Sequence, residues 1–182
     1  MKKLTKRDAI LNAMLDVVVE RGFHEAPMSL IAERSGASAG VIYHHFASKE
    51  EIIQALYDRV KATKLESILE GYSPEMDAKD AFILAWTNTY RFYRQHQREL
   101  RFLDQYEAAG FVCRPEESAA AEFERRFRSR SKGGVLNGLP PEVIQEMTLG
   151  LAGRLAKQPR ALGAAVLRKV AEKLWESVRA ED

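Results

Sequence analysis

Apolar residues recur every three or four positions along most of the chain, which is the spacing of one helix face. In the first such stretch Leu11, Leu15 and Val18 share a face, and Gly22 ends the pattern. Alternation of apolar and polar residues, which is the pattern of a strand, does not run to a useful length anywhere in the sequence. The pattern therefore predicts an all-α fold.

Breaks that contain glycine or proline divide this pattern into separate helices. After the helix that ends at Gly22, the expected helices cover residues 28–34, 39–45, 48–69, 77–95, 98–109, 116–131, 142–156 and 160–179. The strongest break is Gly138-Leu139-Pro140-Pro141, which precedes the last two helices. Two serines supply helix starts: Ser38 suits an N-cap, and Ser48 forms a capping box with Glu51, three residues later.

The short helices at 28–34 and 39–45 have the arrangement of a helix-turn-helix, with Gly36 able to adopt the left-handed conformation that the tight turn requires. The first helix of such a pair crosses the phosphate backbone of DNA, and the second lies in the major groove. Ile31, Ile42 and Phe46 are expected to pack on the first helix of the chain. Short helix pairs also occur as plain packing units, so this pattern alone leaves both interpretations open.

The most specific motif is the run IAERSGASAGVIYHHF at residues 31–46, followed by SKEE at residues 48–51. It resembles the DNA-binding signature of the TetR family of bacterial transcriptional regulators, and the resemblance is close over about residues 5–60. The resemblance implies a homodimer of helical subunits, each with an amino-terminal DNA-binding domain and a divergent carboxy-terminal domain for an effector and for dimerisation. We therefore expect a three-helix helix-turn-helix domain at 1–47 and a helical effector-binding and dimerisation domain at 48–182.

The same resemblance implies which residues contact DNA. The residues expected to contact phosphate are Lys6, Ser29, Tyr43 and Lys49. The residues expected to face bases or the wall of the groove are Ser38, Ala39, Gly40, Val41 and His44. From the residues alone, Tyr43 has a second interpretation as a core aromatic.

Two departures from the family pattern affect how bases are read. Many members carry Lys, Arg or Pro where Ala39 stands and Thr where Val41 stands, and Thr or Ser is common where Ala26 and Pro27 stand. The base-reading surface therefore has few hydrogen-bonding groups. The remaining contacts expected are hydrogen bonds from His44 and Ser38, and methyl contacts from Ala39 and Val41 with thymine.

Aromatic residues at helical spacing in the carboxy-terminal part suggest an apolar cavity for a small-molecule effector that is itself apolar or aromatic. The residues expected to bind this effector are Trp86, Tyr90, Phe102, Tyr106 and Met147, with Asn88 or Gln105 as polar partners. A stripe of this kind is also what an ordinary helical core requires, so both interpretations remain open.

The last two expected helices carry small residues and wide apolar faces. Gly150 and Gly153 lie on the first of them, and Ala164 and Ala165 lie on the second. Such residues allow close approach of helices, and two helices from each subunit would form a four-helix interface around a two-fold axis. We expect a homodimer; the alternative is that both helices pack only within one subunit.

Composition adds limits. Apolar residues make up 46% of the chain, charged residues 30%, and the net charge is +2, so binding to DNA must depend on the placement of charges. The longest apolar runs are far shorter than the roughly 20 residues of a membrane-spanning helix, and no secretory signal is visible. The single cysteine, Cys113, has no partner for an internal disulfide. We expect a cytoplasmic protein with no membrane association.

Catalysis is not expected, because the sequence has no zinc-protease motif, no glycine-rich phosphate loop and no Gly-x-Ser-x-Gly. No metal site or cofactor is expected either, since the adjacent His44 and His45 point to different sides of a helix. The basic runs at 91–101 and 125–132 are interpreted as solvated helix surfaces, with an anionic effector or a nucleic-acid contact as the alternative.

The sequence therefore predicts a ligand-responsive regulator, a repressor that binds a palindromic operator as a homodimer and is released by an effector. The alternative is a helical interaction module that has lost DNA reading, which the departures at Ala39 and Val41 keep open. The effector, the operator sequence, and repression as opposed to activation are not encoded in any motif.

Overall fold

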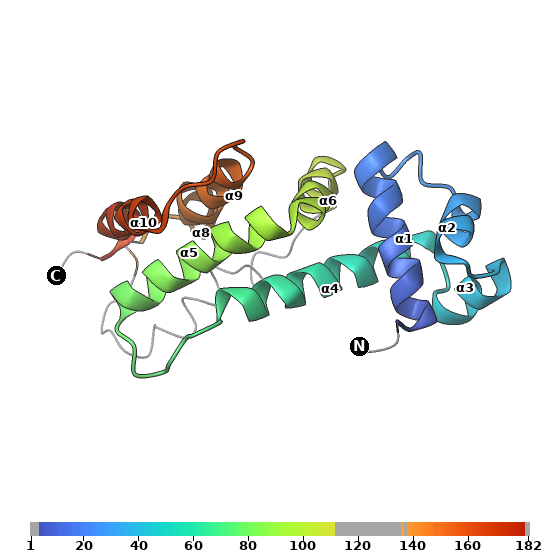
Figure 1. Ribbon diagram of the computed structural model, residues 1–182, viewed down its shortest axis with the longest axis horizontal. Coiled ribbons are helices and arrows are strands. Elements are labelled where there is room, and N and C mark those ends of the chain that lie inside the picture. Colours follow the sequence, from blue (N-terminus) through green and yellow to red (C-terminus); the bar gives the residue numbers. More distant parts are fainter. Residues whose placement is uncertain (1–3, 112–135, 137, 181–182) are drawn as a thin grey trace. The chain divides into compact units, whose positions relative to one another are not determined.

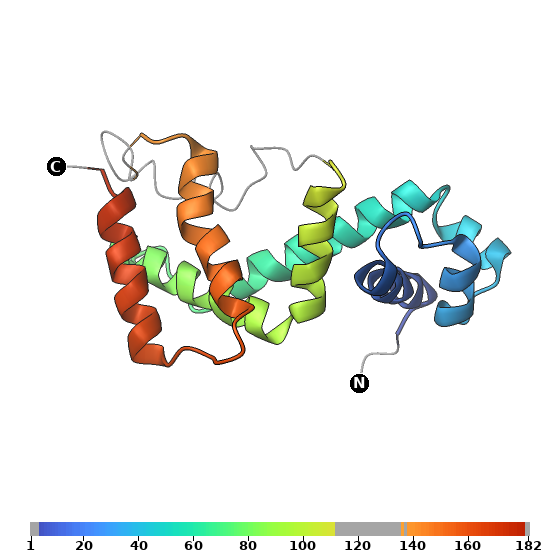
Figure 2. The ribbon, with the colours of Figure 1, turned by 90° about the horizontal axis from the view of Figure 1, so that it is seen from above.

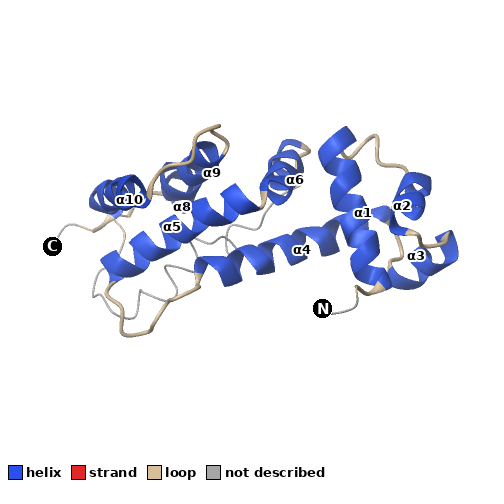
Figure 3. Cartoon of the chain, viewed as in Figure 1, coloured by secondary structure: helices blue, strands red, loops and turns tan. Residues whose placement is uncertain are grey.

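The computed structural model describes residues 4–111, 136 and 138–180. Within these ranges all the regular secondary structure is helical (Figure 3). The one β-type pairing in the described residues is an isolated antiparallel bridge between Leu136 and Arg179. The all-α prediction is confirmed. The expected helix at 116–131, the basic run at 125–132 and Cys113 lie outside the described residues.

The chain divides into two compact units. The first contains residues up to Thr63 together with Arg98–Phe111, and the second contains Lys64–Gln97 together with residues from 112 onward. The helices of the first unit are α1 (Lys6–Arg21), α2 (Met28–Ser35), α3 (Ala39–His45), most of α4 (Lys49–Ile68) and nearly all of α6 (Gln97–Ala108). The second unit contains the end of α4, α5 (Ala78–Gln95), α8 (Pro141–Gln145), the π-helical turn η3 (Glu146–Gly150), α9 (Leu151–Ala156) and α10 (Ala164–Val178).

Side chains cap the starts of α1 and α4 in the first unit, and the Ser48 cap of α4 is one that the sequence predicts. The Thr5 hydroxyl accepts a hydrogen bond from the Asp8 amide at 3.1 Å and begins α1. The Ser48 hydroxyl accepts one from the Glu51 amide at 3.1 Å, and the Glu51 carboxylate accepts one from the Ala47 amide at 2.5 Å. Side-chain caps of this kind satisfy amides that a helix leaves without partners in its first turn.

An aromatic cluster forms much of the core of the first unit. The ring of Phe23, just after α1, meets the ring of Phe102 at 5.7 Å and that of Phe111 at 5.2 Å, both edge to face. Tyr106 stacks on Tyr57 of α4 at 4.2 Å. These contacts join α6 to α1 and α4, although α6 is some fifty residues away in the sequence from α4's start.

In the second unit, α9 and α10 both pack on α5, as Figures 1 and 2 show. Leu167, Ala171 and Trp175 share the buried face of α10, and the ring of Trp175 lies 5.5 Å from that of Phe82 on α5. The spacing of four residues between these positions is that of one helix face. Within the described residues, no helix is long and apolar enough to cross a membrane.

The structure corrects two helix boundaries. The helix expected at 142–156 is interrupted by η3, where the turn widens so that Thr148 lies inside and its carbonyl oxygen accepts a hydrogen bond from Trp86 Nε1 at 3.0 Å. The last helix begins at Ala164 and not at 160, because Gly163 is extended and the Leu162 amide donates to the Tyr90 hydroxyl at 2.9 Å.

Candidate nucleic-acid interface

A tight turn joins α2 to α3 in the first unit. Gly36 has φ 62°, the left-handed conformation, and ends α2. Ser38 is extended, and its hydroxyl accepts a hydrogen bond from the Val41 amide at 3.4 Å, which begins α3. Between these two residues the side chain of Ala37 is buried. The glycine and the serine therefore take the positions that the sequence predicts for them.

One face of α3 is fixed to the core. Ile42 is 1% exposed and belongs to the same apolar cluster as Ile31 of α2 and Phe46 after α3. The guanidinium of Arg7 lies 5.1 Å above the ring of Phe46, a cation–π contact from α1. These contacts confirm the predicted packing of Ile31, Ile42 and Phe46 and hold α3 firmly against α1.

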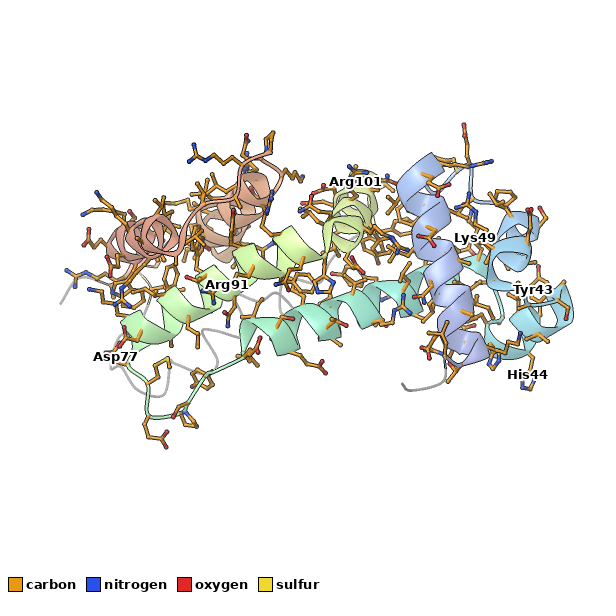
Figure 4. All side chains as sticks on the ribbon, in the orientation of Figure 1. Tyr43, His44, Lys49, Asp77, Arg91 and Arg101 are labelled. Atoms are coloured by element: carbon orange, nitrogen blue, oxygen red, sulfur yellow. The ribbon has the colours of Figure 1, made fainter. Side chains whose placement is uncertain are left out.

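The other face of α3 is open to solvent. Tyr43 is 57% exposed, and Figure 4 shows it on α3 together with His44, which is also exposed. The remaining residues predicted to face the groove are Ser38, Ala39 and Gly40, all exposed, and Val41, which is half-buried. The exposure of Tyr43 rules out its second interpretation as a core aromatic. The structure therefore presents the predicted groove-facing residues on one short, well-supported helix.

Both lysines predicted to contact phosphate donate to main-chain carbonyls of the same unit. Lys6 Nζ donates to the Gly36 carbonyl at 3.3 Å from an exposed position at the start of α1. Lys49 Nζ, at the start of α4, is half-buried and donates to the Phe23 carbonyl at 2.6 Å (Figure 4). An ammonium has three N–H donors, so each lysine retains donors beyond the one that these bonds use.

The amino-terminal end of α2 has no side-chain cap. Pro27 occupies the N-cap position and makes no side-chain hydrogen bond, and Ser29 in the first turn is exposed. The first amides of a helix are natural donors to phosphate, because they point along the axis at the positive end of the helix dipole. The departure at Pro27 from the family pattern thus leaves the start of α2 without a competing side-chain acceptor.

Negative charge on α1 is compensated within the unit. The guanidinium of Arg34 on α2 donates to both carboxylate oxygens of Glu20, at 2.8 and 2.6 Å. This hydrogen bonding lowers the pKa of Glu20 below its ordinary value and raises that of Arg34. The pKa of Asp8 is also lowered, chiefly by the hydrogen bond from the Thr5 hydroxyl. Compensated carboxylates repel DNA phosphates less than free ones.

The residues predicted to bind an effector fall into both units. Phe102 and Tyr106 lie in the aromatic core of the first unit, at 0% and 5% exposure. Trp86 and Tyr90 are buried in the second unit, where their polar atoms bond to the Thr148 carbonyl and the Leu162 amide. Met147, in η3, is 39% exposed. The effector site remains a prediction.

The two predicted polar partners of the effector, Gln105 and Asn88, differ in their hydrogen bonding, and Arg94 makes a contact that the sequence did not indicate. Gln105 Oε1 is buried without a hydrogen-bond partner in the described part of the chain, whereas Asn88 Nδ2 donates to the Ile68 and Glu70 carbonyls. Arg94 donates to the carbonyls of Ala156 and Gln158 and so closes the end of α9. Among the described residues, no group of His, Cys, Asp and Glu side chains is arranged to hold a metal ion.

Comparison with known proteins finds a family match that includes the exposed helix α3. A family model described as "Bacterial regulatory proteins, tetR family" matches residues 10–56. The chain is 27% identical over 161 residues to the fatty acid metabolism regulator protein of Bacillus subtilis, covering 86% of this chain and 78% of that protein. It is 48% identical over 50 residues to the HTH-type transcriptional regulator UidR of Escherichia coli, covering 28% of this chain and 26% of that protein.

Solved structures share the whole fold. A TetR family transcription regulator from Marinobacter aquaeolei superposes with a TM-score of 0.81 at 18% identity, covering 97% of this chain and 96% of that one. The fatty acid degradation regulator FadR from Bacillus halodurans superposes with a TM-score of 0.66 at 18% identity, covering 96% and 97%. The helix-turn-helix at 28–45 lies within the family match at residues 10–56, so the amino-terminal region of the chain is a DNA-binding region of the TetR type, and the whole chain shares the fold of solved TetR-family transcriptional regulators.

Proposed function

We propose that the protein is a transcriptional repressor that binds a palindromic operator as a homodimer in the bacterial cytoplasm and is released by a small-molecule effector. The observation that carries this proposal is the two-sided character of α3. Ile42 anchors it in the core, while Tyr43 and His44 are exposed on a helix of the length that a major groove admits.

The DNA contacts in this proposal follow the predicted positions. Phosphate is contacted by Lys6, Ser29, Tyr43 and Lys49. Bases and groove wall are met by Ser38, Ala39, Gly40, Val41 and His44. The Ser38 hydroxyl accepts from the Val41 amide, so its own O–H is left to donate to a base or phosphate. The functional boundary after residue 47 belongs to the same proposal, and it differs from the division by packing, which keeps α6 with the DNA-binding helices.

Selection of random duplex DNA by the purified protein, with Tyr43→Ala as the control, tests the proposal. The expected result is an inverted repeat that the control fails to enrich, because a homodimer reads two half-sites related by its two-fold axis. Positions facing Val41 should prefer thymine, whose methyl group suits an apolar contact. Enrichment of no sequence, with and without candidate effectors, would favour the alternative, a helical module that binds protein.

The lysines give a prediction that separates phosphate contact from structural support. Lys6→Gln is expected to reduce the slope of log K against log salt concentration by about 1.8 per dimer, since each lost phosphate contact is worth about 0.9. Lys49→Gln should reduce the slope similarly and also lower thermal stability, because it breaks the bond to the Phe23 carbonyl. Operator binding measured between low and moderate salt checks both variants. An unchanged slope with weaker binding would make either lysine a purely structural residue.

The effector in this proposal is apolar. Trp86 and Tyr90 are buried with their polar atoms already bonded to the main chain, so they offer a ligand mainly apolar surface. Two similar proteins are named as regulators of fatty acid metabolism or degradation. Long-chain fatty acids, tested free and as thioesters, are therefore expected to weaken operator binding, whereas a sugar acid should leave it unchanged. A release by the sugar acid alone would contradict the apolar effector.

Binding within the second unit would act on DNA through α4, whose residues belong to both units.

Dimerisation in this proposal uses the carboxy-terminal helices. Val143 of α8, Met147 of η3 and Val166 of α10 are large apolar side chains at 39%, 39% and 49% exposure. Apolar groups left open on neighbouring helices are typical of a surface that a partner covers. A second copy of the chain would bury them and would place two recognition helices on one operator.

A further inference from the structure

An acidic and a basic side chain flank a glycine on the exposed surface of the second unit. Glu146 opens η3, Gly150 closes it, and Arg154 follows in α9, so the three residues are spaced by four. The Glu146 carboxylate accepts a hydrogen bond from Arg154 Nη2 at 2.8 Å, with the two side chains 60% and 69% exposed. An ion pair this open to water adds little to the stability of the subunit.

Gly150 leaves room for the Glu146 carboxylate to lie over it. A Cβ atom built on Gly150 would lie 2.7 Å from Glu146 Oε2, which is closer than real side chains approach. The carboxylate therefore lies flat across the helix surface at this point. Gly150 has no side chain of its own and the group over it is the end of a flexible side chain, so another helix can approach closely there once the Glu146 carboxylate turns away.

The widened turn of η3 sets which residues share this surface. Thr148 is 4% exposed, and its hydroxyl donates a hydrogen bond to the Ile144 carbonyl at 2.6 Å. Its carbonyl oxygen accepts a hydrogen bond from Trp86 Nε1. With Thr148 held inside, Met147 lies at the surface beside Glu146 and Gly150. The π turn thus gives one exposed stripe that combines an apolar side chain, a glycine and two opposite charges.

This stripe is complementary to an antiparallel copy of itself. An acid stands four residues before Gly150 and a base stands four residues after it. If two such helices cross at Gly150 on a two-fold axis, Glu146 of each copy lies opposite Arg154 of the other. Resting on the homodimer of the proposed function, we propose that the subunits dock in this register, and that each Glu146 exchanges its own Arg154 for Arg154 of the partner subunit.

The exchange has a consequence for partner choice. In the free subunit the two charges neutralise each other within one chain, so the face stays hydrated. In the dimer the same charges form two pairs between chains, and a different helix that presents like charges at these positions is repelled. The glycine sets the crossing point, the charges set the direction and register, and Val143 and Met147 supply apolar contact.

Charge reversal in the full-length protein tests this register by sedimentation equilibrium. Glu146→Arg and Arg154→Glu alone are each expected to raise the dimer dissociation constant at least about tenfold, because each single variant places like charges opposite one another. The double variant Glu146→Arg/Arg154→Glu should recover the dissociation constant of the unchanged protein to within about threefold. Thermal unfolding of each variant checks that the subunit fold is kept.

Mixing the two single variants provides the sharpest control. One variant then carries two bases at these positions and the other carries two acids, so an equal mixture should form heterodimers in preference to either homodimer. A merely intramolecular ion pair predicts no such preference. If the unchanged protein is a dimer but neither the single variants nor the mixture differs from it, the register is wrong and the proposed homodimer stands. If the unchanged protein is monomeric while it binds its operator, both are wrong.

Discussion

Replacing Phe102 by alanine is expected to lower the free energy of unfolding by about 3–5 kcal/mol. The side chain is 0% exposed and lies in the aromatic core of the first unit, where its ring meets those of Phe23 at 5.7 Å and Tyr106 at 6.0 Å. Truncation removes this burial and leaves a cavity that the surrounding helices can close only in part. Chemical denaturation followed by far-ultraviolet circular dichroism measures the loss.

Two control variants separate a core role from a ligand-binding role. Phe102→Leu keeps most of the buried volume and should lose clearly less stability than the alanine variant, about 1–2 kcal/mol. Met147→Ala truncates a residue that is 39% exposed and should change the free energy of unfolding by at most about 0.5 kcal/mol in the monomer. A stable Phe102→Ala protein with an altered response to effector would show that Phe102 lines a ligand site instead.

The helix-turn-helix could be predicted because its signals are local. A left-handed glycine at Gly36 and a hydroxyl cap at Ser38 specify a tight turn from a few neighbouring residues. The burial of Ile42 and the exposure of Tyr43 follow from which side of a seven-residue helix each occupies. No distant contact has to be known to predict this part of the structure.

The aromatic residues further along show the limit of such reasoning. Helical spacing indicates that Phe102 and Tyr106 are buried, but it does not indicate which core receives them. Both pack against Phe23, just after α1, and Tyr106 also stacks on Tyr57 of α4; only tertiary structure brings these partners near. Trp86 is buried as well, in a different unit and with its N–H bonded to Thr148.

Backbone irregularities were likewise invisible to the sequence pattern. The residues of η3 are compatible with an ordinary α-helix, and the Thr148 carbonyl within the π turn accepts a hydrogen bond from Trp86, sixty-two positions away in the chain. The Leu162 amide, just before α10, likewise donates to the distant Tyr90 hydroxyl. The partners of Lys6 and Lys49 are also main-chain carbonyls distant in sequence, which no motif encodes.

Replacing Tyr43 by alanine is expected to weaken operator binding by about 100-fold, with no comparable loss of stability. The side chain is 57% exposed, so its truncation leaves no cavity in the core. In the proposed homodimer each recognition helix makes the phosphate contact once, so the variant loses it twice. A loss of about 1.4 kcal/mol at each half-site, which is tenfold, therefore multiplies to about 100-fold for the whole operator.

The conservative variant Tyr43→Phe identifies the group responsible. If the hydroxyl donates to phosphate, Tyr43→Phe should lose most of the affinity that Tyr43→Ala loses; if the ring packs on the sugar-phosphate backbone, it should retain most of it. Fluorescence anisotropy with labelled operator measures all three proteins at one salt concentration, because phosphate contacts make the affinity depend on salt. Binding of Tyr43→Ala at full strength would remove Tyr43 from the interface. Since Ile42 and Phe46 hold α3 in place from its other side, the recognition helix keeps its position in either variant, so that a change in affinity reports on the contact itself.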